Sequence, residues 1–256
     1  MIKGSDRMGQ PIVTLITGAD KGIGFQTARE LGQLGQVIVI GARNQRKGLS
    51  AADALQNMGI EASFVQLDVT SQAQITQAAV TINDRYGYLS VLINNAGVAM
   101  DNHQAASDMP TAIMRKDFDV NFFGVVDVIQ AMLPLLKKAD SARIINVSSN
   151  MGSLSLAAAP ESQFYGVNSL GYQASKAAVN FATISFSKEL IDTSITVNSV
   201  NPGWTATEFG GRASDAPTPA GMQTVTEGAA QIVKVASDPT FTANGSFTEN
   251  AGTIQW

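Results

Sequence analysis

The sequence predicts a doubly wound α/β fold, in which helices cover both faces of a parallel sheet and make three layers. Short apolar runs rich in β-branched residues alternate with stretches of helical periodicity from residue 12 to residue 200. Such alternation is typical of strands joined by right-handed helical crossovers. The chain has 256 residues, of which 45% are hydrophobic, and neither a composition break nor an internal repeat divides it. We therefore expect a single domain over residues 1–256.

Six strands are expected, each closed by a glycine or a polar residue. They cover residues 12–16, 37–40, 62–67, 89–94, 143–147 and 195–200. Between them, apolar residues at helical spacing predict helices over residues 25–31, 48–58, 71–86, 111–138 and 172–191. In such sheets the ligand lies outside the carboxyl ends of the strands. The residues that follow the strands are therefore the candidate site.

The first strand leads into a glycine turn at residues 17–24. Gly18, Gly22 and Gly24 give the spacing GxxxGxG, and Ile23 opens the apolar face of the next helix. Glycine permits unusual backbone angles and lets a ligand approach the main chain. The helix N-terminus then offers free N–H groups to a phosphate. The turn predicts a nucleotide site; tight-turn chemistry alone is the alternative.

The end of the second strand indicates which nucleotide is bound. An NAD site needs an acidic residue there, whereas this chain has Arg43. A guanidinium attracts the 2′-phosphate of NADP, and Lys21 in the glycine turn adds a second cation. NADP(H) is therefore the expected cofactor, unless both are merely solvated charges. Asp68 is expected to accept from the adenine amino group with Val69 beside the ring, or to cap the helix that starts near Ser71.

Tyr172 and Lys176 are four residues apart, so they share one face of a helix. Lowering a tyrosine pKa from ~10 by ~2–3 units needs ~3–4 kcal/mol. One ammonium ~4 Å away at an effective dielectric of ~20 supplies ~4 kcal/mol, before desolvation is counted. The pair therefore predicts an acid–base tyrosine; a solvated helix pair is the alternative.

These features occur together with others in a fixed order along the chain. The set comprises the glycine turn, Asn94-Asn95-Ala96-Gly97, Asn121, Ser149, Tyr172 with Lys176, and Pro202-Gly203. It resembles the short-chain dehydrogenase/reductase family over essentially the whole chain. The resemblance implies a Rossmann-type oxidoreductase that moves hydride between a nicotinamide and a carbonyl or alcohol carbon.

The resemblance also implies roles for individual residues. Tyr172 would be the general acid in reduction, and Lys176 would lower its pKa and bond the nicotinamide ribose. Ser149 would hold the substrate oxygen, and Asn121 would hold a water that links Lys176 to solvent. Tyr172 and Lys176 thus also count as cofactor contacts. The other implied contacts are Asn95, Ala96, Gly97, Pro202, Gly203, Thr205 and Thr207, with Thr207 on the carboxamide.

Lys21, Arg43 and the run 201–204 look like the carbonyl-reductase branch, which uses NADPH. The segment between Ser149 and Tyr172 is longer than in many members. The expected substrate wall is apolar and bulky, which favours a neutral, hydrophobic ketone or aldehyde. It comprises Met151, Leu154, Tyr165, Trp204 and Phe209, and residues 208–226 are expected to form a mobile lid. The alternatives are a 3-oxoacyl thioester reductase and a non-catalytic nucleotide-binding regulator.

The composition of the chain also bears on its binding partners, its metal sites and its location. The net charge is −4 with scattered Lys and Arg, which indicates no nucleic-acid partner. The chain has no cysteine and one histidine, His103, so neither a disulfide nor a metal site is expected. With no apolar run of membrane-spanning length and no signal peptide, a cytoplasmic protein is expected. Residues 177–182 could pair with a second copy, so a homodimer or homotetramer is possible and a monomer is not excluded.

Overall fold

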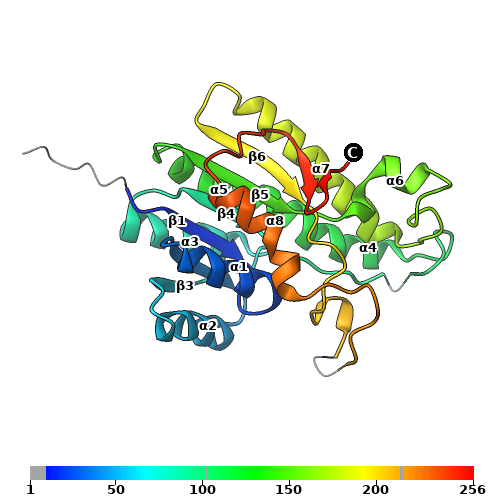
Figure 1. Ribbon diagram of the computed structural model, residues 1–256, viewed down its shortest axis with the longest axis horizontal. Helices are drawn as coiled ribbons and strands as arrows, with labels where there is room; N and C mark the ends of the chain where they lie inside the picture. The colour runs from blue at the N-terminus through cyan, green and yellow to red at the C-terminus, as the bar shows by residue number, and fades with distance from the viewer. Residues whose placement is uncertain (1–9, 102, 214–215) are drawn as a thin grey trace, which may run out of the picture.

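The computed structural model describes residues 10–101, 103–213 and 216–256. They form one eight-stranded sheet in the order β3-β2-β1-β4-β5-β6-β7-β8 (Figure 1). The strands are β1 (Val13–Thr17), β2 (Val37–Ala42), β3 (Ala62–Gln66), β4 (Val91–Asn94), β5 (Ala142–Val147), β6 (Ile195–Val200), β7 (Phe247–Glu249) and β8 (Gly252–Thr253). β1 to β7 pair in parallel and β8 is antiparallel to β7. The predicted doubly wound sheet is thus confirmed, with an antiparallel strand added at its edge.

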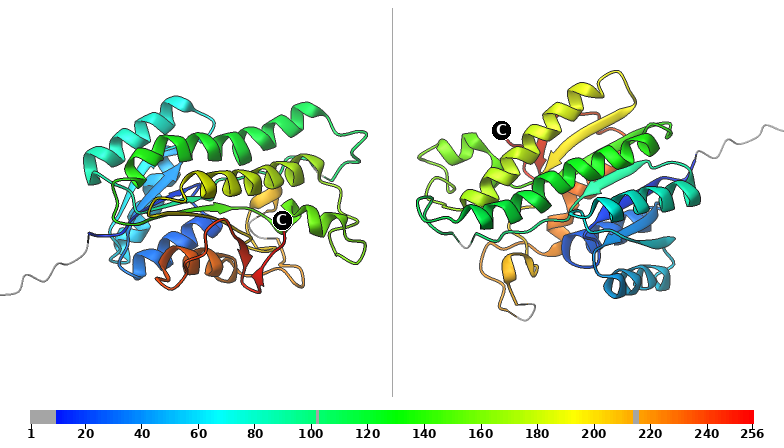
Figure 2. Two further views of the ribbon diagram at one scale, coloured as in Figure 1. Left: turned by 90° about the horizontal axis from the view of Figure 1, so that it is seen from above. Right: turned by 180° about the vertical axis from the view of Figure 1, so that it is seen from behind.

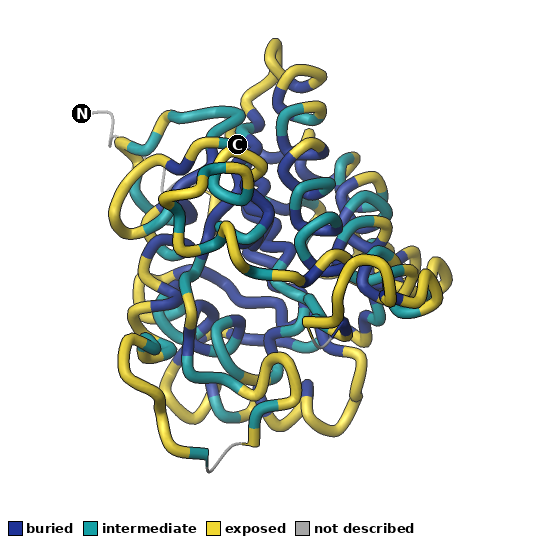
Figure 3. Tube along the Cα trace, turned by 90° about the vertical axis from the view of Figure 1, so that its right-hand side faces the viewer, coloured by how far each residue is buried: buried dark blue, intermediate teal, exposed yellow. Residues whose placement is uncertain are grey.

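Helices cover both faces of this sheet (Figure 2). They are α1 (Gly22–Gln33), α2 (Gln45–Asn57), α3 (Gln72–Tyr86), α4 (Thr111–Phe118), α5 (Gly124–Leu136), α6 (Leu154–Ala158), α7 (Leu170–Glu189) and α8 (Val225–Ser237). One apolar core joins the sheet to α3, α5 and α7, and a second joins it to α1, α2 and α8. Figure 3 shows the buried strands between these layers. The strand ends are therefore fixed by packing on both faces.

The structure corrects the helix expected over residues 111–138. It is interrupted by a π-helical turn, Asp119–Phe123, between α4 and α5. A π turn inserts one residue into the helical ladder and often marks a functional position. Asn121 lies in this turn and is completely buried. The interruption thus places a candidate catalytic residue.

Residues Thr111–Leu136 are long and apolar enough to cross a membrane by length and composition, which differs from the expectation that no such run exists. Val128, Ile129 and Met132 on this stretch are fully buried in the core beside the sheet. A core helix passes the same test as a membrane span, so the stretch is weak evidence for one.

The C-terminal segment, for which no element was expected, ties the long segment before Tyr172 to the sheet edge. Ser153 Oγ donates to the Gln255 carbonyl at 2.7 Å, and Ser155 Oγ to the Trp256 carbonyl at 2.6 Å. The Trp256 ring stacks on Phe247 of β7 with 5.5 Å between centroids. The start of α6 is therefore held by contacts to the end of the chain.

Candidate active site

The glycine turn after β1 has the backbone that its spacing predicted. Gly18 and Gly22 have φ of 63° and 58°, in the left-handed region that favours glycine. A Cβ on Gly24 would lie 2.5 Å from Asn95 Nδ2, which is too close for a side chain. The N-cap of α1, Lys21, makes no side-chain cap, so the first N–H groups of α1 are available to a phosphate. The turn therefore fits the pyrophosphate of a dinucleotide.

Asn95 stabilises this turn through its side chain. Its Nδ2 donates to the carbonyls of Thr17 and Gly18 at 2.9 and 3.1 Å. The Thr17 hydroxyl in return accepts from the backbone N–H groups of Asn95 and Ala96 at 3.0 Å each. The end of β4 is thus bonded to the end of β1. Both amide hydrogens of Asn95 and its backbone N–H are therefore used within the protein.

The four expected catalytic residues come from three neighbouring parts of the fold. Ser149 follows β5, Asn121 is in the π turn, and Tyr172 and Lys176 are on the first turns of α7. Lys176 Nζ lies 5.8 Å from the centre of the Tyr172 ring and donates to the Val147 carbonyl at 2.8 Å. All four are buried. The structure therefore brings the predicted set together at the carboxyl end of the sheet.

Burial controls the acidity of the two central groups. It raises the pKa of Tyr172 to about 12, against a lowering by a hydrogen bond with Ser149. Burial also lowers the pKa of Lys176 to about 8. The net shift of the Tyr172 pKa is thus upward rather than downward as expected, because burial of the phenol is its largest cause.

Asn121 has a structural role that the sequence did not predict. Its Oδ1 accepts from the Val98 N–H at 2.8 Å, and its Nδ2 donates to the Val98 carbonyl at 2.8 Å and to Ser175 Oγ at 2.9 Å. Both amide hydrogens are therefore used within the protein. The side chain fixes the loop after β4 against α7.

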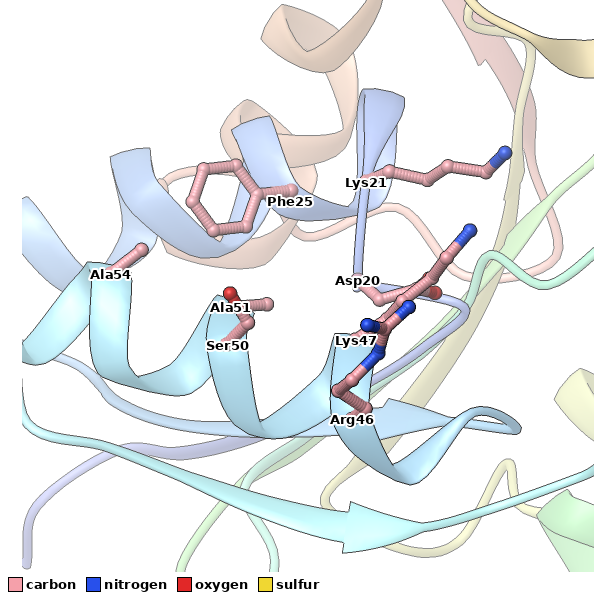
Figure 4. A pocket seen from close by; sticks show the side chains of 8 residues that line it. All are labelled: Asp20, Lys21, Phe25, Arg46, Lys47, Ser50, Ala51 and Ala54. Atoms are coloured by element: carbon pink, nitrogen blue, oxygen red, sulfur yellow. The ribbon is translucent and has the colours of Figure 1, made fainter.

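A pocket of 490 Å³ lies between the N-termini of α1 and α2 (Figure 4). Lys21, Arg46 and Lys47 line it with Asp20. Sequence reasoning missed Arg46 and Lys47, although two successive cations at a helix start after the second strand are a readable signal. Lys21 forms an ion pair with Glu208. The other expected cation, Arg43, is exposed and is not part of the pocket lining.

The contacts of Asp68, which was expected beside the adenine ring with Val69, differ in part from the expectation. Ser71, not Asp68, caps α3, since its hydroxyl accepts from the Gln74 N–H at 3.4 Å. Asp68 Oδ1 instead accepts from Thr70 N and Oγ1 at 3.0 and 2.7 Å. Val69 is buried, and a Cβ on Gly124 would lie 2.8 Å from its Cγ2. The helix-cap alternative for Asp68 is therefore wrong.

The run after β6 divides into an internal and a groove-facing part. Gly203 has a left-handed φ of 76°, which closes the turn that begins at Pro202. Thr205 is buried and its hydroxyl lies within hydrogen-bond distance of the Pro202 and Gly203 carbonyls, so this hydroxyl faces its own turn rather than a ligand. Thr207 lies at the glycine turn, 3.4 Å from the position of a Cβ on Gly22.

Phe209, one of the residues expected in the substrate wall, lies against Tyr172. Its ring centre is 5.8 Å from that of Tyr172, and its Cε2 lies 3.8 Å from the position of a Cβ on Gly97. Met151 follows Ser149 and donates its N–H to the serine hydroxyl at 3.2 Å. Leu154, Tyr165 and Trp204 are more than half exposed, at 71%, 57% and 58%. Phe209 and Met151 therefore adjoin the catalytic centre, whereas these three present side chains to solvent.

Comparison with known proteins agrees with this geometry. The family model described as short chain dehydrogenase matches residues 12–218. The short-chain dehydrogenase anuI of Penicillium roqueforti is 34% identical over 239 residues, covering 90% of this chain and 89% of the relative. The monensin polyketide synthase putative ketoacyl reductase of Streptomyces virginiae is 34% identical over 202 residues, covering 78% and 73%. The solved structure of NADPH-bound carbonyl reductase from chicken fatty liver superposes with a TM-score of 0.82 at 28% identity, covering 96% of this chain and all of that one.

Proposed function

The chain belongs to the short-chain dehydrogenase family, and from this premise we propose that it is an NADPH-dependent reductase of a neutral, hydrophobic ketone or aldehyde. The observation that carries the proposal is the convergence of Ser149, Tyr172 and Lys176 at the carboxyl end of the sheet, the end that also holds the glycine turn after β1. NADPH, when bound, supplies the hydride. The protein supplies the proton and the positioning.

NADPH fits the residues along the groove. The uncapped N-terminus of α1 suits the pyrophosphate, and Lys176 and Tyr172 would meet the nicotinamide ribose. Lys21, Arg46 and Lys47 gather positive charge in the pocket beside that helix start, and we assign the 2′-phosphate to this pocket. The likeness to an NADPH-bound carbonyl reductase supports NADPH as the cofactor.

The proton comes from Tyr172. A ketone oxygen gains negative charge as hydride arrives, and two preplaced hydroxyls, those of Tyr172 and Ser149, stabilise it. The pKa of about 12 keeps the phenol protonated at neutral pH, so that it is ready to donate. Lys176 holds its ammonium at the Val147 carbonyl, beside the same ring. We propose that the backbone carbonyl of Asn121 holds a water molecule. This water would return protons to Lys176.

The substrate is assigned from the apolar side chains at the catalytic centre. Phe209 covers Tyr172, and Met151 follows Ser149. Neither side chain can pair with a carboxylate or a phosphate, which favours a neutral carbonyl compound. The likeness to a putative ketoacyl reductase favours one second candidate, a 3-oxoacyl thioester.

The test mixes the purified protein with NADPH or NADH and neutral aryl and alkyl ketones, and follows the absorbance of the reduced nicotinamide. Turnover with NADPH is expected, and Tyr172→Phe should reduce kcat by roughly a thousandfold or more while NADPH still binds. Tyr88→Phe is the matched control, because it removes a phenol whose hydroxyl donates to the Pro11 carbonyl, away from the site. A preference for NADH, or turnover of 3-oxoacyl thioesters alone, would contradict the proposal. NADPH binding without turnover of either substrate class would favour a nucleotide-binding regulator.

The location of the protein in the cell and its assembly are also proposed from the sequence. We propose a cytoplasmic protein that pairs with a second copy through α7, where the Phe181 side chain is 70% exposed. The longer segment between Ser149 and Tyr172 leaves the Phe181 side chain exposed.

A further inference from the structure

Two buried carboxylates lie behind the first turn of α7, and the proposed reaction has given neither a role. Asp101, in the loop after β4, is 3% exposed, and Asp117, near the end of α4, is fully buried. Burying an ionisable carboxyl group is costly unless it is well bonded. Two of them beside a catalytic tyrosine therefore need an explanation.

Asp101 is bonded to the backbone of the catalytic tyrosine itself. Its Oδ2 accepts from the Tyr172 N–H at 3.0 Å, and its Oδ1 accepts from Ser169 Oγ at 2.7 Å. Ser169 is the N-cap of α7 but makes no cap of its own. Asp101 supplies that cap from 71 positions earlier in the chain. A negative charge here is also favoured by the dipole of α7.

Asp117 fixes the same loop from the other side. Its Oδ1 accepts from the Met100 N–H at 3.0 Å, whereas its Oδ2 has no hydrogen-bond partner among the described residues. That Oδ2 lies 2.8 Å from the position that a Cβ on Gly171 would take. The carboxylate therefore stands against the first turn of α7, one residue before Tyr172, where a side chain would not fit.

The loop after β4 thus connects the cofactor groove to the tyrosine. Asn121 bonds both the N–H and the carbonyl of Val98, next to Gly97 in the groove. Asp117 then bonds Met100, and Asp101 bonds Tyr172. A displacement at either end of this loop would be carried to the phenol.

We propose that Asp101 and Asp117 are positioning residues of the reaction: Asp101 sets the place of Tyr172 through its backbone N–H, and both put negative charge behind the phenol. This inference rests on the proposed function and deepens it. A phenol held in its protonated form is a proton donor at neutral pH. Alcohol oxidation needs the same group to lose its proton first, so negative charge behind the phenol moves that reaction to higher pH.

The charges that face Tyr172 support this direction. Asp117 and Asp101 both raise its pKa, adding to burial, and Ser149 lowers it. Lys176 on the same helix is the cation beside the ring, and Phe209 on the lid side carries no charge. Burial and the charge of Asp101 raise the pKa of Asp117 itself to about 6, against the Met100 N–H, which lowers it. The Asp117 carboxyl group therefore carries a negative charge at neutral pH and becomes protonated in mild acid.

The experiment measures kcat for alcohol oxidation with NADP⁺ against pH. In Asp117→Asn the ascending limb should move to lower pH by roughly half a unit to one unit, because a buried negative charge near the phenol is removed. Asp119→Asn, which neutralises an exposed carboxylate on the adjoining turn, should leave the limb in place. A purely structural role for Asp117 would change kcat without moving the limb.

Asp101 is tested by a rescue series. Asp101→Ala should reduce kcat roughly ten- to a hundredfold with an unchanged Kd for NADPH, because the tyrosine is misplaced. Asp101→Asn keeps an acceptor for the Tyr172 N–H and should recover most of that loss. Asp108→Asn, an exposed carboxylate in the same loop, is the control. If the alanine and asparagine variants are equally impaired, or neither is impaired, Asp101 does not position the tyrosine through that bond.

A titration separates this inference from the proposed function. The chain has four tyrosines, so the tyrosinate absorbance of the protein minus that of Tyr172→Phe reports Tyr172 without any substrate. Asp117→Asn should ionise Tyr172 at lower pH than the unsubstituted protein does. If no carbonyl compound is reduced but this shift appears, the proposed function fails and the electrostatic inference stands. If reduction occurs but neither the titration nor the pH limb moves, the inference alone fails.

Discussion

Replacing Asp117 by asparagine should favour the folded protein more at neutral pH than in acid. The folded protein raises the pKa of Asp117 from its ordinary 3.8 to about 6. A carboxyl whose pKa is raised by folding favours the folded state only while it is protonated. Its contribution is complete below the unfolded pKa and is lost as the pH rises through the folded value. At ~1.36 kcal/mol per pH unit, the charged carboxylate costs up to about 3 kcal/mol once the pH is well above 6, and less to the extent that water screens it.

The assay is urea unfolding of the unsubstituted protein and Asp117→Asn at about pH 4 and about pH 7.5. The new amide has its own cost beside Gly171, but that cost is the same at both pH values and cancels in the difference. We expect the variant's relative stability to rise by up to about 3 kcal/mol between the two. Asp119→Asn should show no such difference. Equal effects of Asp117→Asn at both pH values would show that the buried carboxyl does not titrate as argued.

Two further predictions concern contacts that hold the groove. Glu208→Gln should lower the Kd for NADPH a few-fold and leave the Kd for NADH unchanged in fluorescence titrations, because it frees Lys21 from its ion pair; equal changes for both nucleotides would contradict this. Gly171→Ala should destabilise the protein by about 1–3 kcal/mol in urea unfolding, since its Cβ would lie 2.8 Å from Asp117 Oδ2. Gly166→Ala, where nothing lies within 4 Å of the added Cβ, should be neutral.

The strands and the shared helix face of Tyr172 and Lys176 could be predicted because their signals are local. A buried parallel strand is a short apolar run, and β6 was expected over the residues that it occupies, Ile195–Val200. Tyr172 and Lys176 lie one helical turn apart, so their spacing alone puts them on one face. Thr224 and Glu227 form a capping box, which is a local signal for the start of α8. This helix was nevertheless not among those expected from the sequence.

Other features could not be read from neighbouring residues. β7 and β8 have 3 and 2 residues, too few for a periodic pattern. The π turn at Asn121 is an extra residue in an apolar helix, and composition does not reveal it. Glu208 pairs with Lys21 across 187 positions of the chain. Contacts at this distance depend on the completed fold.

The pKa of Tyr172 also could not be predicted from residues that are close in the sequence. The sequence indicates that an ammonium stands one turn away, but it does not give the depth at which both groups are buried. Burial raises the Tyr172 pKa, which is opposite to the expected shift, because desolvation disfavours the charged phenolate. The two aspartates that add to this effect come from segments 55 and 71 positions away, as the numbers of Asp117, Asp101 and Tyr172 show.

The position of the lid and the acidity of the proton donor are linked through Phe209. Its ring covers that of Tyr172, while the preceding residue, Glu208, pairs with Lys21 at the other end of the groove. Burial is the main cause of the raised tyrosine pKa, so opening of the lid expected over residues 208–226 would expose the phenol and lower that pKa. Asp101 and Asp117 lie behind α7 and do not depend on the lid. Their charge would therefore continue to raise the pKa of the phenol when the lid opens and the effect of burial is lost.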